Sequence, residues 1–440
     1  MMDAKKLGLV FFPAFDWAIS PTHPEREERL LYTRDQIVEE GLLDMPSIGE
    51  YKPMMATYQD IERVHLGVPD IASLITDAHL VSAGGAITAA AGVMRREVER
   101  AFALVRPPGH HAMRVVHGTR GFCAINIEAI MVEHLREVYG VRKVAIVDTD
   151  VHHGDGTQDI FYHNADTLFI SFHQDGRTLY PGTGFIDELG SPMAMGTTIN
   201  LPLPPGTTDD GLHEVLDHFI LPVLADFKPD IIINSAGQDN HYSDPLANMA
   251  ITAQGYARLA DKLKADIAVL EGGYSIEDAL PYVNVGIILA MAGLNYAKVI
   301  EPDLHKCPVQ PSSVTNYIKS LVKERQEMWA KRENLKREAM AKAGDFWTRS
   351  RSIYYDDSGI NEQQTETLRL CPKCSGYLTL GTEARALGFG YKSAFAAVIS
   401  REACFQCRQA AIDAVHKAKK QEKYQHYYVQ NKYEDRLEKI

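Results

Sequence analysis

The chain of 440 residues has no long hydrophobic run, few cysteines and no excess of basic charge. Its longest uncharged apolar stretch, residues 285–294, is far shorter than the roughly 20 residues that span a bilayer, so we expect no membrane partner. Six cysteines are too few for a disulfide framework in a chain of this length, which favours a reducing, cytoplasmic location. The net charge of −12 provides no general basic surface, so nucleic acid is not an expected partner.

What the chain does contain indicates a large folded protein. Hydrophobic residues make up 45% of the sequence and charged residues 24%, a balance that excludes intrinsic disorder. The first apolar run, residues 7–12, is interrupted by Pro13 and Asp16 and has no small-residue cleavage site after it. It therefore predicts a first strand rather than a signal peptide.

Short apolar runs alternate with amphipathic stretches over most of the length. Because several runs are apolar on both faces, they predict an α/β fold with an open, mostly parallel sheet flanked by helices. The expected strands are residues 7–12, 101–105, 144–148, 167–173, 197–203, 230–236 and 265–271, and the clearest expected helices are 127–139, 210–227 and 253–264. In such a sheet, ligands bind beyond the carboxyl ends of the strands.

Composition also divides the chain along its length. We expect a large α/β domain in residues 1–315 and a long charged helix in 316–347, solvated and held by i,i+4 ion pairs. Residues 348–366 are polar and lack periodicity, which predicts a linker. A cysteine-bearing tail follows in residues 367–440.

The predicted strand 144–148 leads directly into polar residues at alternate positions. Asp148, Asp150 and His152 therefore project from one face at the end of the strand, and a carboxylate beside an imidazole can bind a divalent metal. The strand 230–236 leads to Asp244 at the same edge, which would complete an Asp/His/Asp set, with Asp239 and His241 as lesser candidates. Three protein ligands leave one coordination position open, as a catalytic metal requires.

Two more strand ends carry residues suited to catalysis. His110 and His111 follow a Pro-Pro-Gly turn after strand 101–105, and adjacent imidazoles suit either a second metal site or an acid–base pair. Asp148 and Asp155 are available to hydrogen-bond these imidazoles. Tyr274 follows paired glycines after strand 265–271, where a phenol can donate to an oxyanion.

Seven motifs along residues 7–294 together resemble the zinc-dependent histone deacetylase family, which includes bacterial acetoin-utilisation proteins and acetylpolyamine amidohydrolases. In order they are RPPGHHA, GFCAIN, DTDVHHGDGTQDIFY, SFHQ, YPGTG, SAGQDNHYSDPLANM and LEGGY. The resemblance implies an arginase- and deacetylase-like fold in residues 1–315 and hydrolysis of acyl-lysine amides in proteins by metal-activated water.

The resemblance also implies residue roles. The metal ligands would be Asp150, His152 and Asp244, holding one Zn²⁺ or, in some members, Fe²⁺. The catalytic residues would be His111 as general base, His110 as its electrostatic partner, Asp148 and Asp155 as their hydrogen-bond acceptors, and Tyr274 polarising the carbonyl. Asp148 and Ser171 would help to bind K⁺, and the acyl-lysine tunnel would be lined by Gly121, Phe122, Tyr180 and Ile251.

The chain departs from the family pattern at a few positions. Ala124 and Ile125 stand where many members carry an aromatic pair, and Tyr180 stands where many eukaryotic members have Phe. No acidic gate for a polyamine is visible near Ile251, although an insertion would be able to supply one. The segment that begins at His23 resembles the HPE motif of the family and predicts an ordered rim loop.

The tail contains two CxxC pairs, formed by Cys371, Cys374, Cys404 and Cys407. This spacing indicates a closed, structural zinc site like that of a zinc ribbon, with redox-active dithiols or unliganded thiols as alternatives. The tail is small, so metal binding would supply much of its folding free energy. Residues 416–436 interleave lysine and tyrosine and predict a solvated helix, with contact to nucleic acid or another partner as the alternative.

The first functional hypothesis is a zinc-dependent deacylase acting on acyl-lysine in proteins. The alternatives are an amidohydrolase of acetylpolyamine type, a ureohydrolase with a binuclear manganese site, and a non-catalytic acyl-lysine reader or scaffold. The presence of every expected ligand, both histidines and Tyr274 favours an enzyme over a reader. Acyl-chain preference and oligomeric state do not follow from the sequence.

Overall fold

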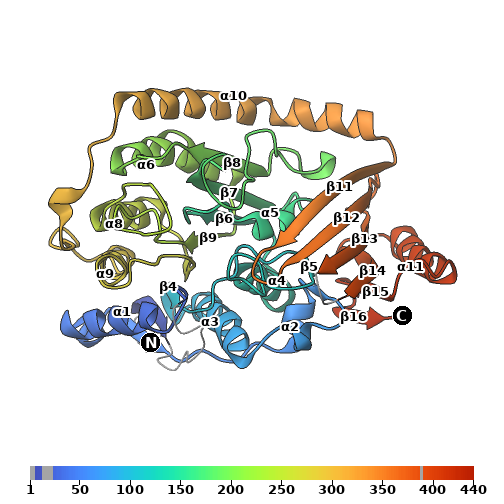
Figure 1. Ribbon diagram of the computed structural model, residues 1–440, viewed down its shortest axis with the longest axis horizontal. Helices are drawn as coiled ribbons and strands as arrows, with labels where there is room; N and C mark the ends of the chain where they lie inside the picture. Colours follow the sequence, from blue (N-terminus) through green and yellow to red (C-terminus); the bar gives the residue numbers. More distant parts are fainter. Residues whose placement is uncertain (1–4, 12–22, 387–389) are drawn as a thin grey trace.

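The computed structural model describes residues 5–11, 23–386 and 390–440. The first part of the chain is built on an eight-stranded sheet with the strand order β2-β1-β4-β10-β9-β6-β7-β8, in which every neighbouring pair is parallel (Figure 1). Its strands are β1 (Lys5–Phe11), β2 (Ile48–Tyr51), β4 (Val98–Leu104), β6 (Val144–Asp148), β7 (Thr167–Gln174), β8 (Thr198–Leu203), β9 (Ile231–Ala236) and β10 (Ile267–Leu270). The prediction of a mostly parallel α/β sheet is confirmed.

Helices pack on this sheet, and this explains why the central strands are apolar on both faces. Helix α3 packs against α4, while α1 and α8 both pack against α9. The helices are α1 (Glu28–Glu39), α2 (Tyr58–Glu62), α3 (Asp77–Met94), α4 (Ile127–Tyr139), α5 (Asp155–Phe161), α6 (Asp209–Val215), a π-helical turn (Leu216–Ile220), α7 (Leu221–Phe227), α8 (Ala253–Leu263) and α9 (Leu280–Met291). A small parallel pair joins β3 (Leu66–Gly67) to β5 (Val115–Val116). Over the described ranges, every helix is too short or too polar to traverse a lipid bilayer.

The long charged helix is α10 (Ser312–Ala343), and it runs along one side of the first domain (Figure 1). The expectation that it is solvated is wrong, because α10 contacts α6 and the turn at Pro192–Ala194, and its first half carries most of its buried side chains. The buried side chains recur every three or four residues, as on the packed face of a helix. They are Val314, Ile318, Leu321, Val322, Arg325 and Met328.

The predicted linker at 348–366 is wrong, because these residues lie in two long strands of a second, six-stranded sheet. This sheet has the order β11-β12-β13-β14-β15-β16. Its elements are β11 (Phe346–Tyr355), β12 (Ile360–Arg369), β13 (Tyr377–Ala386), β14 (Gly390–Ile399), α11 (Phe405–Lys420), β15 (His426–Asn431) and β16 (Arg436–Lys439). The domain therefore begins at β11 rather than at residue 367.

The physical reason for this error is that the buried face of β12 is polar. Glu362, Gln364 and Glu366 alternate along it and are buried, so the strand has no hydrophobic alternation to detect. The carboxylate of Glu366 instead pairs with Arg349 and Arg351 of the neighbouring strand. The predicted solvated helix at 416–436 is also wrong beyond Lys420, because β15 follows and is largely buried.

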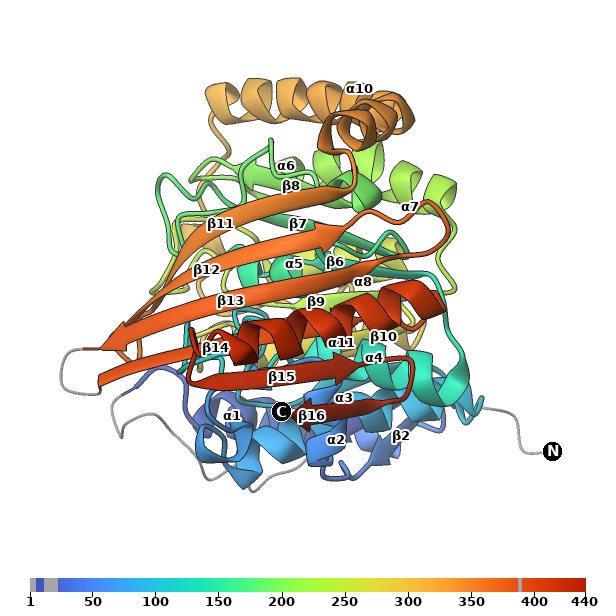
Figure 2. The ribbon, with the colours of Figure 1, turned by 90° about the vertical axis from the view of Figure 1, so that its right-hand side faces the viewer.

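The six-stranded sheet lies across one face of the first domain, with α11 on its outer side (Figure 2). A shared hydrophobic cluster joins the two, with Val68 and Val115 from the first domain and Leu368 and Leu380 from the sheet. The buried carboxylate of Glu133 in α4 receives two ion pairs across the interface, from Arg401 at 3.2 Å and Lys432 at 3.1 Å. The C-terminal part is therefore a second domain docked firmly on the first.

Candidate active site

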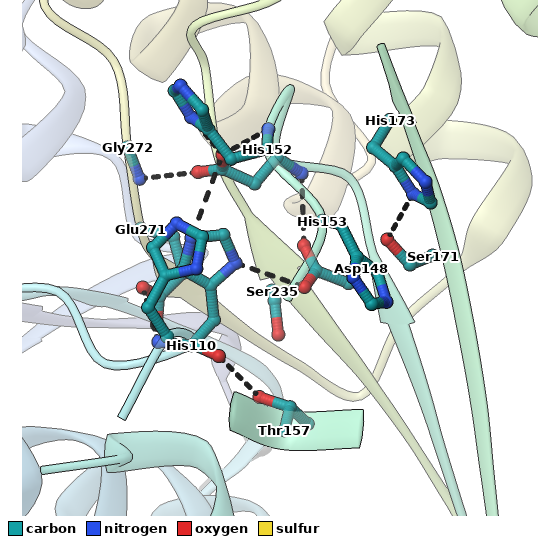
Figure 3. Close-up of polar contacts among 12 residues, drawn as sticks. His110, Asp148, His152, His153, Thr157, Ser171, His173, Ser235, Glu271 and Gly272 are labelled. Atoms are coloured by element: carbon teal, nitrogen blue, oxygen red, sulfur yellow. Dashed lines mark hydrogen bonds and ion pairs between the residues drawn. The ribbon is translucent and has the colours of Figure 1, made fainter. Parts of the chain in front are cut away.

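The predicted polar residues gather at the carboxyl ends of the central strands. In the register of the sheet, Asp148 at the end of β6 lies opposite Ser171 of β7 on one side and Ser235 of β9 on the other. The residues after β4 and β10 reach the same edge, where His110, Asp148 and Glu271 lie together (Figure 3). The topology thus brings five separate segments to one place.

The two adjacent histidines are buried and each contacts a buried carboxylate. Nδ1 of His110 lies 3.1 Å from Asp148 Oδ2, and Nδ1 of His111 lies 2.8 Å from Asp155 Oδ1, which are the pairings that the resemblance implied. Backbone N–H groups of Gly109 and His110 donate to Glu271 Oε2 at 2.7 Å and 3.1 Å. The contact of each Nδ1 with a carboxylate therefore fixes the ring orientation, and the Glu271 carboxylate fixes the backbone at Gly109 and His110.

The surroundings give the two histidines opposite pKa shifts. Burial lowers the pKa of His111 to about 3, with a further contribution from the charge of His110. Burial also disfavours the charged form of His110, but Asp150 and Asp148 outweigh it and raise the pKa of His110 to about 10. Burial raises the pKa of Asp155, yet the Arg120 guanidinium holds it well below its usual range. At neutral pH the pair therefore combines a neutral imidazole with a charged one.

A group of three buried ligand residues lies beside the histidines. Nδ1 of His152 is 3.1 Å from both Asp150 Oδ1 and Asp239 Oδ2, and the ligand atoms of these three residues all lie within 4.8 Å of one another. Asp244, which the resemblance assigned as the third ligand, is outside this group. Its Oδ2 accepts the backbone N–H of Tyr274 at 2.6 Å, which orients it toward the loop after β10. The structure thus places the lesser candidate, Asp239, next to His152.

The chemistry of this donor set fits a divalent metal. Carboxylate oxygens and an imidazole nitrogen are common ligands of catalytic zinc. Burial raises the pKa of Asp239, as does the charge of Asp150, and burial together with Asp239 raises the pKa of Asp244 to about 7. A bound cation would relieve this repulsion among buried carboxylates.

The two candidate third ligands can be separated by substitution. If Asp239 binds the metal, Asp239→Asn will weaken metal binding at least about tenfold, and Asp244→Asn will weaken it by a smaller factor. The opposite ranking would assign the ligand role to Asp244, as the resemblance implied. Isothermal titration of metal into the metal-free variants measures both. Asp413→Asn, an exposed aspartate of α11, is the matched control and should bind like the wild type.

Tyr274 lies across from these groups and is held by a buried ion network. It follows Gly273, whose φ of +124° requires glycine, and its side chain is 8% exposed. The Arg29 guanidinium lies 4.9 Å from the Tyr274 ring, and Arg29 Nε donates to the carbonyl of Gly273 at 2.7 Å. Arg29 and Arg106 both pair with the buried Glu25. The loop that carries the phenol is therefore held by a network of residues from three separate segments.

Comparison with known proteins agrees with this arrangement. The Histone deacetylase domain matches residues 71–286. A "Probable deacetylase" of Archaeoglobus fulgidus is 47% identical over 311 residues, which cover 64% of this chain and 85% of that protein. The acetylpolyamine amidohydrolase of Burkholderia pseudomallei is 41% identical over 201 residues, covering 44% of this chain and 57% of that protein. The crystal structure of the HDA15 HD domain superimposes with a TM-score of 0.65 and 26% identity, over 77% of this chain and 99% of that one.

The chain belongs to the histone deacetylase family. The prediction of a hydrolase that acts on amides is confirmed, and membership implies a catalytic metal and an acetylated substrate. The roles of individual residues and the type of substrate stay predictions. In this deacetylase the motifs named from the sequence occupy the region where the family domain matches.

Three of the four predicted tunnel residues of the deacetylase lie beside His111 or Tyr274. The His111 ring lies 5.2 Å from the Tyr180 ring, and the Phe122 ring lies 5.7 Å from Tyr274. A Cβ on Gly121 would lie 2.4 Å from His111 Cδ2, so this position has no room for a larger residue. Ile251 is different, because it is buried in the main hydrophobic core. Its predicted place on the rim is not supported, since an apolar side chain gains more from core packing.

Sequence reasoning missed several residues that shape the site. Glu271 was noted only as part of the LEGGY motif, yet its carboxylate holds the backbone before the histidines. Arg29 was not identified, although it lies four residues after Glu25 of the HPE segment. For Glu271 the available signal was a charged residue directly after the apolar run 267–270. His241, a lesser metal candidate, instead contacts Glu301 at 3.3 Å and Ser243 at 2.9 Å.

The four cysteines of the C-terminal domain lie together as predicted. Their sulfur atoms are all within 4.8 Å of one another. Cys371 and Cys374 lie between β12 and β13, whereas Cys404 and Cys407 lie at the start of α11. A cluster of this kind is suited to a structural metal, because all four positions of a tetrahedral site are supplied by the protein.

Proposed function

We propose that this deacetylase removes acyl groups from lysine side chains of proteins in the cytoplasm, with Zn²⁺ as the catalytic metal. The observation that supports it is one site containing the His110–Asp148 and His111–Asp155 pairs, the Asp150–His152–Asp239 group and Tyr274. Amide hydrolysis needs an activated nucleophile, a stabilised oxyanion and a proton for the leaving amine, and these groups can meet all three needs.

Each group has a defined task in this proposal. Asp150, His152 and a carboxylate after β9 would hold the zinc, which when bound supplies a Lewis acid for water and the amide carbonyl. Because Nδ1 of His111 donates to Asp155, Nε2 is left to accept a proton from the attacking water. His111 then returns this proton to the leaving amine. The Tyr274 hydroxyl donates to the oxyanion, and charged His110 adds electrostatic stabilisation.

Two further ions belong to the proposal. Asp148 and Ser171 would help to bind K⁺ next to the catalytic metal, since they are neighbours in the register of β6 and β7. The hydroxyl of Ser171 also contacts His173 Nδ1 at 2.9 Å (Figure 3). The four cysteines would hold a second, structural Zn²⁺. Fe²⁺ is the alternative metal at the catalytic site.

A second candidate function is hydrolysis of acetylated polyamines. It is favoured by two carboxylates, Asp356 and Asp357, that contact the predicted tunnel residues Gly121 and Phe122. The sequence alone showed no acidic gate for a polyamine near Ile251, because these two carboxylates belong to the predicted linker. Negative charge at this place would attract the free ammonium groups of a polyamine.

The deciding experiment compares kcat/KM of the zinc-loaded protein on an acetyl-lysine peptide and on an acetylated polyamine. We expect the peptide to be the better substrate. A preference for the polyamine would replace the first proposal by the second. Activity on neither would contradict both and direct the search to longer acyl groups.

Replacing Tyr274 by phenylalanine tests the oxyanion role. We expect kcat to fall about 100- to 1,000-fold, because one donor to the oxyanion is lost. The melting temperature and metal content should stay at the wild-type values, since the ring and its contacts with Phe122 and Arg29 remain. Full activity in the variant would show that Tyr274 does not donate to the oxyanion.

A further inference from the structure

We propose that the C-terminal domain builds part of the substrate tunnel, through the turn between β11 and β12. We call residues 356–359 the hairpin turn and residues 119–122 the tunnel segment. The inference rests on the proposed function, because it takes Gly121, Phe122 and Tyr180 as the tunnel wall. It assigns to Asp356 and Asp357 a positioning role that sets the width of the tunnel.

The side chains of three consecutive turn residues accept hydrogen bonds from backbone N–H groups of the tunnel segment. Ser358 Oγ accepts from Thr119 at 2.8 Å, and Asp357 Oδ2 accepts from Phe122 at 2.8 Å. Asp356 Oδ1 accepts from Gly121 at 3.2 Å. Hydrogen bonds to a charged acceptor are stronger than neutral ones, so the two carboxylates hold this backbone firmly.

The tunnel segment needs such support because its conformation is unfavourable. Gly121 has φ of +51° and Phe122 has φ of +67°, a left-handed region that a bulky residue rarely adopts. A backbone of this kind persists only when its surroundings hold it. Asp357 accepts the N–H of Phe122 and therefore helps to hold this backbone conformation. This conformation brings the Phe122 ring to Tyr274.

The hairpin turn also reaches the opposite wall of the tunnel and the general base. The Tyr180 hydroxyl donates to Asp356 Oδ1 at 2.9 Å, so one carboxylate joins Gly121 to Tyr180. Arg120 donates to the carbonyl of Tyr354 in β11 and, through Nε at 3.0 Å, to Asp155 Oδ2. Asp155 in turn holds His111. The C-terminal domain is thereby connected to both tunnel walls and to the catalytic histidine.

The fit between turn and tunnel segment is close. A Cβ on Gly118 would lie 2.5 Å from Ser358 Oγ, so glycine at this position lets the hairpin turn approach. Tyr355, next to the turn, is buried and its hydroxyl contacts the carbonyl of Val115 at 2.8 Å. Figure 1 shows the hairpin of β11 and β12 extending from the end of α10 toward the middle of the first domain. The contacts at Ser358 and at Tyr355 thus fix the position of the hairpin turn relative to the tunnel segment.

The test uses the full-length, zinc-loaded Asp356→Ala/Asp357→Ala variant. Two peptides are compared, one with acetyl-lysine and one with 4-(acetamidomethyl)phenylalanine, whose ring is wider than a lysine stem. A loosened wall should raise KM for acetyl-lysine roughly tenfold and lower the preference for acetyl-lysine, as a ratio of kcat/KM values, by a similar factor. This ratio does not depend on the folded fraction, so partial unfolding cannot imitate the effect.

Two control variants define the outcome. The Asp356→Asn/Asp357→Asn variant keeps acceptor oxygens without charge and should restore most of the preference for acetyl-lysine. Asp413→Ala, an exposed aspartate in α11, should behave as the wild type. An unchanged KM and preference in the alanine variant would overturn the inference, and so would an asparagine variant that behaves like the alanine variant. A wild type that hydrolyses neither peptide nor polyamine would instead contradict the proposed function.

Discussion

Replacing Asp150 by alanine is expected to lower kcat/KM by at least about 1,000-fold, because the metal loses one of three protein ligands. Asp150 contacts His152 Nδ1 at 3.1 Å and accepts the backbone N–H of Gly272 at 2.8 Å, so its loss also frees the loop after β10. Elemental analysis of the purified variant should show one metal equivalent missing, while the equivalent held by the four cysteines stays.

The control for this prediction is Asp413→Ala, which removes an exposed carboxylate far along the chain from the catalytic motifs and should leave activity unchanged. If Asp150→Ala kept both its metal content and its activity, the assignment of the Asp150–His152–Asp239 group as the metal site would be wrong. If the variant lost activity but kept its full metal content, Asp150 would be a positioning residue and not a metal ligand.

The second large effect is expected from the paired substitution Cys371→Ser/Cys404→Ser. Structural zinc contributes about 10–16 kcal/mol of binding free energy to small domains. This is as large as the whole free energy of unfolding of a typical folded protein, about 5–15 kcal/mol. Removing two of four ligands should therefore unfold the region around α11 and the β12–β13 connection, where the four cysteines lie. The melting temperature of the domain should fall by more than about 5 °C.

Thermal unfolding followed by circular dichroism measures this change, and zinc analysis reports the lost equivalent. Cys307→Ser is the matched control, since Cys307 is outside the cluster and is held by weak contacts to Ala250. Its melting temperature should stay close to that of the wild type. A cysteine-pair variant that kept its melting temperature after losing the metal would show that hydrophobic packing alone holds the domain.

The central sheet and the metal motif were predictable from the sequence for a common reason. Strand β6 was expected at residues 144–148 and is observed at Val144–Asp148, because a buried parallel strand must be apolar on both faces. The alternation of polar residues beyond it then directs Asp150 and His152 to the same side. Both inferences depend only on local geometry, so they did not need the tertiary structure.

The second sheet was not predictable, because its stability depends on polar pairs between residues distant in sequence. Arg351 pairs with Asp159 across the domain boundary, and Glu366 also pairs with His163 at 3.1 Å. A strand whose buried face is charged carries no periodic hydrophobic signal, and only its partners make burial favourable. Arg29 was not predictable for the same reason, because it donates to the carbonyl of Gly273, which is distant in sequence.

The sequence by itself determined the parallel α/β fold, the family, the two histidines with their carboxylate partners and the four-cysteine group. The fold and the four-cysteine group follow from local patterns and spacing, whereas the family and the histidine–carboxylate pairings follow from the resemblance of the seven motifs. Only the tertiary structure decided that Asp239 lies beside His152, and that Asp356 and Asp357 reach the tunnel segment. The reason is that a loop carboxylate can turn toward several neighbours, and the packing of distant segments selects which of them it meets.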